Sequence, residues 1–141
     1  MATAQDSQTQ KIEFTLGGQM YCVDVRYVTE VANVRDITPI PGASAHVKGM
    51  MDLRGRTTSI IDPKIVFDIE DTGDAESILV FDPAEVDDGA VGWIVNEVTQ
   101  VAEIDETEVG DALAGSNDAV RGILHRDDEF VIWVDPNGIS L

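Results

Sequence analysis

Basic residues are scarce in this sequence of 141 residues, which has nine Lys and Arg against 27 Asp and Glu and a formal net charge of −18. The shortage argues against nucleic acid as a partner, because affinity for phosphates comes mainly from Lys and Arg. It argues equally against electrostatic docking on an anionic membrane. We therefore expect neither nucleic acid nor a lipid surface among the partners.

Cysteine and long apolar runs are scarce as well. Cys22 is the single cysteine, so no intramolecular disulfide can form, and its neighbours Met20, Tyr21 and Val23 predict a packed, inert thiol. No apolar run approaches the roughly 18 residues that a membrane span needs. The N-terminal residues MATAQDSQTQ lack the apolar region of a signal peptide. We expect a cytoplasmic protein that does not insert into the membrane.

Motifs for catalysis and metal binding are missing. His46 and His125 stand alone, a single cysteine provides no zinc set, and the sequence has no P-loop, GxSxG or GxGxxG motif. The acidic pairs at 87–88 and 127–128 lie beside turn residues, and residues 68–76 lack the order of an EF-hand loop. We interpret these acids as solvated surface, and predict no enzymatic activity, no cofactor and no metal site.

Hydrophobic residues make up 43% of the chain, which is enough to build a core within one domain of ordinary size. Short runs of alternating or continuous apolar residues, bounded by Gly, Pro and Asp, predict about ten strands. The expected strands cover residues 12–16, 21–25, 48–53, 57–61, 77–81, 90–95, 98–104, 120–125 and 129–134, with one more entered by a helical turn over 28–34. Another helical turn is expected from Pro63. Such a pattern indicates a sandwich or barrel.

The predicted domain covers residues 10–141, after a flexible tail at residues 1–9 that is polar and aperiodic. Charge divides unevenly along it, because residues 1–66 hold seven acids and seven bases whereas residues 67–141 hold 20 acids and two bases. An acid excess with little Lys is similar to that of halophilic proteins, whose carboxylates repel one another until salt screens them. Our hypothesis is that the protein folds fully only at high salt.

Six of the nine basic residues lie between residues 26 and 64, and two of them flank a glycine in the predicted tight turn at 54–56. One interpretation is an intramolecular salt bridge of Arg54 with Glu30 or Asp62, which contributes little to stability at a surface. The other is an anchor for a protein partner, since Arg is enriched at interface hot spots. Composition favours neither interpretation.

Motifs over nearly the whole chain, from about residue 11 to residue 141, resemble the CheW family of chemotaxis coupling proteins. They are F-x-L-x(4)-Y at 14–21, V-x-E-V at 28–31, I-T-P-I-P at 37–41, V-x-G-M-M-D-L-R-G-R at 47–56 and G-W-I-V-N-E-V at 92–98. The order and spacing of these pieces carry the resemblance. Asp52 stands where the family usually has Asn, and Asn96 where it often has Asp.

The resemblance implies an all-β fold of two intertwined five-stranded SH3-like β-barrels, with short helical turns and a hydrophobic core between the barrels. It implies a non-enzymatic chemotaxis adaptor that couples methyl-accepting chemoreceptors to the histidine kinase CheA, at receptor clusters on the inner face of the membrane. The partners would be the regulatory domain of the kinase and the cytoplasmic tip of the receptors. The alternative is a CheW-like scaffold in a non-chemotactic histidine kinase complex.

The resemblance also implies site residues. Glu30, Gly49 and Arg54 match family positions implicated in coupling, and Val28 belongs to the same motif as Glu30. Met50 is a candidate apolar contact beside the polar anchor Arg54. The protein-binding residues expected from this comparison are Val28, Glu30, Gly49, Met50, Arg54 and Arg56. We expect the docking surface to be the least acidic face of the molecule.

Overall fold

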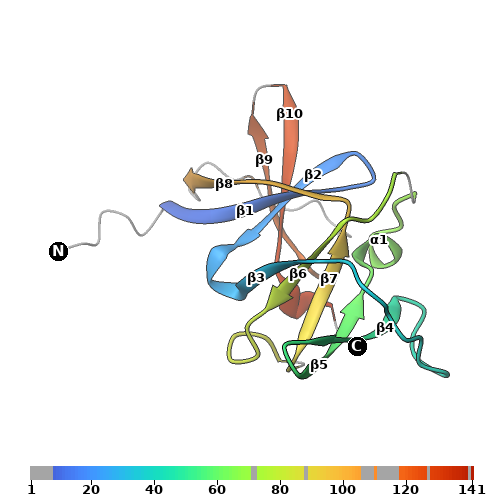
Figure 1. Ribbon diagram of the computed structural model, residues 1–141. Coiled ribbons are helices and arrows are strands. Elements are labelled where there is room, and N and C mark those ends of the chain that lie inside the picture. The colour runs from blue at the N-terminus through green and yellow to red at the C-terminus, as the bar shows by residue number, and fades with distance from the viewer. Residues whose placement is uncertain are drawn as a thin grey trace.

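The computed structural model describes residues 8–70, 73–87, 89–105, 110, 118–126, 128–139 and 141. These residues form ten strands, one short α-helix and two 3-10 turns (Figure 1). The strands are β1 (Gln8–Leu16), β2 (Gln19–Asp24), β3 (Val28–Asn33), β4 (Val47–Leu53), β5 (Arg56–Ile61), β6 (Ser77–Phe81), β7 (Val91–Val95), β8 (Glu97–Asp105), β9 (Val120–Arg126) and β10 (Glu129–Val134). The helix is α1 (Pro63–Val66), and the turns are η2 (Val25–Tyr27) and η4 (Pro136–Gly138). None of the helices in this part of the chain is long and apolar enough to cross a membrane.

Each predicted strand has a counterpart in the structure, with two differences. The helical turn expected over residues 28–34 is wrong in position, because the turn is η2 and residues 28–33 form β3. Its β-branched residues pair with β6 and alternate between half-buried and exposed positions, as a strand at the edge of a sheet does. Gln8 and Thr9, expected in the flexible tail, pair with β8. Residues 1–7 of that tail lie outside the described residues.

The ten strands form two five-stranded sheets with the orders β8-β1-β2-β10-β9 and β3-β6-β7-β5-β4. In both orders the third and fourth strands run parallel and the other neighbours run antiparallel. We call the first unit the terminal barrel, because β1 and β2 complete it alongside β8–β10, and the second the central barrel. The predicted all-β fold of two intertwined five-stranded SH3-like barrels is confirmed.

Both barrels close by the same device, in which the segment after one edge strand bonds to the other edge strand. In the central barrel Thr38, which follows β3, exchanges two backbone hydrogen bonds of 2.8 and 2.9 Å with Met50 of β4. In the terminal barrel Gly110, which follows β8, exchanges bonds of 2.9 and 3.1 Å with Ile123 of β9. Closure leaves few unpaired backbone groups at the edges, which limits uncontrolled strand pairing.

The hydrophobic core has three parts. The largest lies between the barrels and contains Trp93, whose ring meets Phe14, Phe67 and Phe81 edge-on with centroids 5.2 to 6.4 Å apart. A second cluster around Cys22 belongs to the terminal barrel, and a third, formed by Met51, Ile60, Ile78 and Ile94, belongs to the central barrel. Edge-to-face aromatic pairs stabilise by about 0.5–1.5 kcal/mol beyond their buried area. The shared core therefore fixes one barrel against the other.

Two ion pairs lie inside the terminal barrel. Lys11, which has no exposed surface, places Nζ 2.7 Å from Oδ1 of Asp24, and Trp133 donates to the same oxygen at 3.0 Å. Arg126 donates from two guanidinium nitrogens to both carboxylate oxygens of the fully buried Glu13, at 2.6 and 2.7 Å. Lys11 and Glu13 are buried, so the loss of Asp24 or Arg126 would leave an uncompensated charge in the barrel.

The acid excess of the C-terminal half of the sequence is shared between the two barrels in the folded protein. The segment 28–95, which forms the central barrel, holds 13 acids and five bases, whereas the remainder of the chain holds 14 acids and four bases. The halves even out because the nearly neutral N-terminal strands join the acidic C-terminal ones in one barrel. Charge therefore differs from place to place on each barrel rather than between the barrels.

Candidate functional site

The β4–β5 hairpin ends in the two-residue turn Arg54-Gly55 that the sequence predicted. Arg54 has φ of 53° and Gly55 has φ of 81°, and Leu53 pairs with Arg56 on either side of the turn. A two-residue turn with positive φ at both positions matches the twist of an antiparallel hairpin. The turn fixes the backbone of Arg54 at the hairpin tip, from which its side chain reaches β3.

Arg54 and Glu30 form a forked ion pair. Nε of Arg54 lies 3.2 and 3.1 Å from the two carboxylate oxygens of Glu30, and Nη2 lies 3.0 Å from Oε1. The hydrogen bonds from Arg54 hold the pKa of the Glu30 carboxyl below its usual range, and the same contact raises the pKa of Arg54. The Arg54 side chain is nevertheless 79% exposed, against 28% for Glu30. The guanidinium is thus oriented by its pair with Glu30 and still faces solvent.

The structure decides which of the two candidate acids pairs with Arg54, while its role as an anchor for a partner stays a prediction. Glu30 is the partner of Arg54, whereas Asp62 accepts a hydrogen bond of 3.0 Å from the backbone N–H of Lys64 and caps α1. Because β3 and β4 are the two edges of the central sheet, the pair also ties the hairpin tip to the opposite edge. Arg54 therefore forms an intramolecular salt bridge and at the same time exposes its guanidinium to solvent.

Two hollows meet at this pair. The larger, of about 590 Å³, is called here the hairpin groove, and the smaller, of about 420 Å³, is called the β3 groove. Glu30, Leu53 and Arg54 line both. The other residues of the hairpin groove are Thr29, Arg56, Thr58, Val80, Phe81, Asp82, Pro83, Ala84, Ala90 and Val91. The forked pair stands where a partner seated in either groove would touch it.

The structure brings three of the six expected site residues together, namely Glu30, Arg54 and Arg56, around the hairpin groove. Val28 is half-buried and packs against the core between the barrels. Met50 is 38% exposed on β4 and is outside the lining of both grooves.

Gly49 acts through the backbone. Its φ is 147°, and a Cβ there would lie 2.1 Å from the carbonyl oxygen of Thr38. Glycine is the residue that permits this approach, and the approach permits the neighbouring bonds between Thr38 and Met50 that close the central barrel. Gly49 therefore shapes the site without offering a side chain to a partner.

The β6–β7 loop is the part of the site that sequence reasoning missed. Asp82, Pro83, Ala84 and Ala90 line the hairpin groove, although the sequence indicates only a turn over 83–89 and the start of a strand at residue 90. Small and turn-forming residues carry no chemical signature. Only the fold places them opposite the β4–β5 hairpin.

Other reactive groups offer little chemistry. Within the described residues, no group of three or more His, Cys, Asp and Glu side chains is arranged to hold a metal ion. Burial raises the pKa of the Cys22 thiol to about 12, which keeps it protonated at neutral pH. His125 packs on the ring of Phe130 with centroids 4.9 Å apart. These features describe packing rather than a reaction centre.

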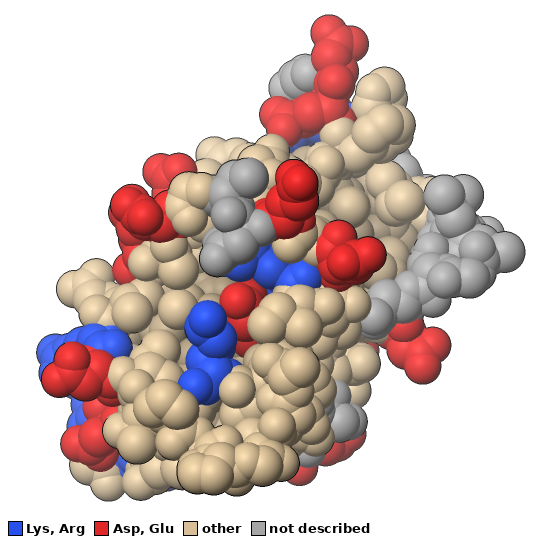
Figure 2. Space-filling model, turned by 90° about the vertical axis from the view of Figure 1, so that its right-hand side faces the viewer, with Lys and Arg blue, Asp and Glu red and all other residues tan. Residues whose placement is uncertain are grey.

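Charge is unevenly distributed over the face seen in Figure 2. The tip that projects at its top is acidic, while Lys and Arg side chains lie across the middle and left of the face, next to broad uncharged areas. The β9–β10 hairpin forms the projection at the top of Figure 1, and its exposed residues include Asp128 and Glu129. The expected location of the docking surface on the least acidic face stays a prediction.

Comparisons with known proteins agree over nearly the whole chain. The sequence model of a family described as CheW-like domain matches residues 10–140. The chain is 28% identical to the chemotaxis protein CheW of Treponema pallidum over 138 residues, covering 92% of this chain and 81% of that protein. It is 28% identical to the chemotaxis protein CheW of Thermotoga maritima over 143 residues, covering 96% and 91%.

A solved structure has the same fold. The crystal structure of the scaffolding protein TtCheW from Thermoanaerobacter tengcongensis superposes with a TM-score of 0.85 at 27% identity. The superposition covers 94% of this chain and 88% of that one.

Proposed function

The chain belongs to the CheW-like domain family and is a chemotaxis adaptor, and from that premise we propose that it couples methyl-accepting chemoreceptors to the histidine kinase CheA without catalysing a reaction. The kinase partner is its regulatory domain, and the receptor partner is the cytoplasmic tip. The adaptor works in the cytoplasm, at receptor clusters reached through protein contacts. Every relative named above is a chemotaxis or scaffolding protein, and no observation favours a non-chemotactic complex.

The observation that carries this proposal is the exposed, pre-oriented guanidinium of Arg54 between two grooves. Arginine anchors at interfaces are effective when their geometry is fixed before binding, because less rotamer freedom is lost. The hairpin groove offers Leu53, Val80 and Val91 beside polar groups. We assign this groove to a helix of the receptor tip, whose apolar face would enter it while an acidic side chain meets Arg54.

The acid excess has a separate role in this proposal. Carboxylates spread over both barrels keep the protein soluble in concentrated salt and repel one another in dilute salt. A halophilic source fits that composition. Binding experiments should therefore be done in molar KCl. The Debye length is then about 3 Å, so only charged groups in direct contact attract each other strongly.

The test is a pull-down in molar KCl with two separate baits, a CheA regulatory domain and a receptor cytoplasmic fragment. We expect the folded protein to bind both. Binding of one bait alone would overturn the proposed coupling of receptor to kinase. Folded protein that binds neither bait would overturn the proposal.

A further inference from the structure

The β6–β7 loop forms part of the hairpin groove, but the contacts that hold it differ from those of the β4–β5 hairpin. Asp82, Pro83 and Ala84 line the groove. Within the loop, Ala84 donates its backbone N–H to Oδ1 of Asp82 at 2.9 Å, and Glu85 donates to the backbone oxygen of Asp82 at the same distance. These local bonds shape the loop, but they do not fix its position relative to the barrel.

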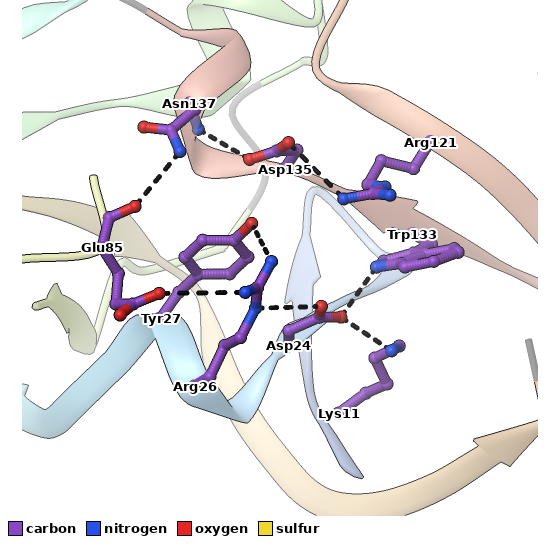
Figure 3. Close-up of polar contacts among 9 residues, drawn as sticks. All are labelled: Lys11, Asp24, Arg26, Tyr27, Glu85, Arg121, Trp133, Asp135 and Asn137. Atoms are coloured by element: carbon purple, nitrogen blue, oxygen red, sulfur yellow. Dashed lines mark hydrogen bonds and ion pairs between the residues drawn. The ribbon is translucent and has the colours of Figure 1, made fainter. Parts of the chain in front are cut away.

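Asn137 of η4 holds the loop from the terminal barrel (Figure 3). Its Nδ2 donates to the backbone oxygen of Glu85 at 3.2 Å. Its Oδ1 accepts from the backbone N–H of Asp87 at 2.8 Å. Its own backbone N–H donates to Oδ1 of Asp135 at 2.9 Å. One side chain thus satisfies two backbone groups of a loop that lies about fifty residues earlier in the chain.

The 3-10 turn that carries Asn137 is itself fixed. A Cβ on Gly138 would lie 2.3 Å from Cα of Ala119, so the turn is packed directly against that backbone. Asp135 donates its backbone N–H to the oxygen of Ala119 at 2.7 Å, and Ile139 is buried in the core between the barrels. Asn137 therefore projects from a rigid base.

Arg26 makes a second, weaker contact with the same loop. Its guanidinium lies over the ring of Tyr27, donates to the Tyr27 hydroxyl at 2.8 Å and lies 3.9 Å from a carboxylate oxygen of Glu85 (Figure 3). The Arg26 side chain is 61% exposed, so salt screens its ion pairs. The neutral hydrogen bonds of Asn137 persist in salt. They act together with Val86, which is buried in the core between the barrels, and with the 2.8 Å bond from the backbone N–H of Asp82 to the backbone oxygen of Tyr27.

We infer that Asn137 is a positioning residue for the hairpin groove: it fixes the β6–β7 loop and thereby increases the affinity of the groove for its partner, although it does not line the groove. A loop that is already ordered loses less conformational entropy when a helix binds beside it. The identity of that helix as part of a receptor tip rests on the proposed function, whereas the fixing of the loop does not.

Asn96 provides a matched control. Its Oδ1 accepts from the backbone N–H of Gly17 at 2.8 Å, and its Nδ2 donates to the backbone oxygen of Asp74 at 3.1 Å. The chemistry is the same, but Gly17 and Asp74 are not part of the groove lining. Asn137→Ala and Asn96→Ala each remove a side-chain amide that bridges two backbone groups.

The first measurement is titration calorimetry of the full chain with a receptor cytoplasmic fragment in molar KCl. We expect Asn137→Ala to weaken binding about tenfold, since each hydrogen bond contributes modestly to a fixed conformation. Asn96→Ala should leave the dissociation constant within about twofold while lowering the melting temperature to a similar extent. Equal losses of affinity in the two variants, or none in either, would overturn the inference about affinity.

The second measurement needs no partner. Amide hydrogen exchange of the free protein should be faster at Ala84, Glu85 and Asp87 in Asn137→Ala, and unchanged there in Asn96→Ala. Unchanged exchange in Asn137→Ala would overturn the inference about the loop. If the wild-type protein binds no receptor fragment, the assignment of the groove to a receptor fails, and the exchange result alone decides whether Asn137 fixes the loop.

Discussion

Arg126 donates from both terminal guanidinium nitrogens to the two carboxylate oxygens of Glu13, and Glu13 has no exposed surface. Gln100 of β8 adds a hydrogen bond of 3.1 Å to the same carboxylate. The contact joins β1, which lies between β8 and β2 in the terminal sheet, to the end of β9 at the edge of that sheet. It counterbalances a charge that burial would otherwise make unfavourable.

Glu13→Gln should therefore destabilise the protein by about 1.5–3 kcal/mol, because the variant loses the charge-assisted hydrogen bonds between Arg126, whose side chain is 30% exposed, and the buried carboxylate. Chemical denaturation in molar KCl measures this loss. Glu103→Gln is the matched control, since Glu103 is exposed on β8, and we expect less than about 0.5 kcal/mol there. Similar small losses in both variants would show that the Glu13 contact adds no net stability.

The same pair predicts a dependence on pH. Hydrogen bonding by Arg126 holds the pKa of Glu13 below its ordinary value of 4.5. A depressed folded-state pKa means that the unfolded chain binds the proton more readily, so the stabilisation is complete above the unfolded pKa and is lost as pH falls through the folded one. We expect the stability difference between wild type and Glu13→Gln to be constant above about pH 5.5 and to shrink below about pH 4.5. A difference that grows in acid would contradict the assignment.

Arg54→Ala should weaken binding of the receptor fragment while changing the melting temperature little. The ion pair with Glu30 is exposed on the Arg54 side, and exposed pairs contribute little to folding. Calorimetric titration and thermal melts of the same preparation separate the two effects. Lys48→Ala removes the same charge from exposed β4 and should leave binding unchanged. A large fall in melting temperature for Arg54→Ala would instead show that the pair stabilises the fold by tying the two edges of the central sheet together.

Gly49→Ala should cost several times more stability than Gly55→Ala. Both glycines have positive φ, at 147° and 81°. An added Cβ at Gly49 meets the Thr38 oxygen at 2.1 Å, whereas at Gly55 it meets open space. The left-handed backbone at Gly55 costs alanine about 1–2 kcal/mol. At Gly49 the close approach to Thr38 adds to the cost of the backbone conformation. Equal losses in denaturation experiments would mean that the central barrel closes without that approach.

Salt should stabilise the fold. At a net charge of −18 the carboxylates repel one another, and added ions screen that repulsion. Circular dichroism with KCl raised from 0.1 M to molar concentrations should show a rising melting temperature. An identical spectrum and melting temperature at low salt would remove the proposed halophilic adaptation.

Much of the fold follows from local patterns. Alternating apolar residues and the turn residues between them predict the positions of the strands. An example is the hairpin of 48–53 and 57–61 around Arg54-Gly55, which the structure contains as β4 and β5. The turn over 28–34 was misplaced because valines at a spacing of three suit a helical turn as well as a strand. Pairing with β6 decides between them, and that partner lies about fifty residues away. Local sequence cannot report such a distant neighbour.

The sequence by itself determined the class of fold, the turn that presents Arg54 and the pool of site residues that its motifs contain. Tertiary structure alone decided that Glu30 pairs with Arg54, that the β6–β7 loop faces the hairpin, and that Asn137 fixes this loop. The reason is physical: alternation and turn chemistry act over a few residues, whereas these contacts require two closed barrels to bring remote segments within hydrogen-bond distance.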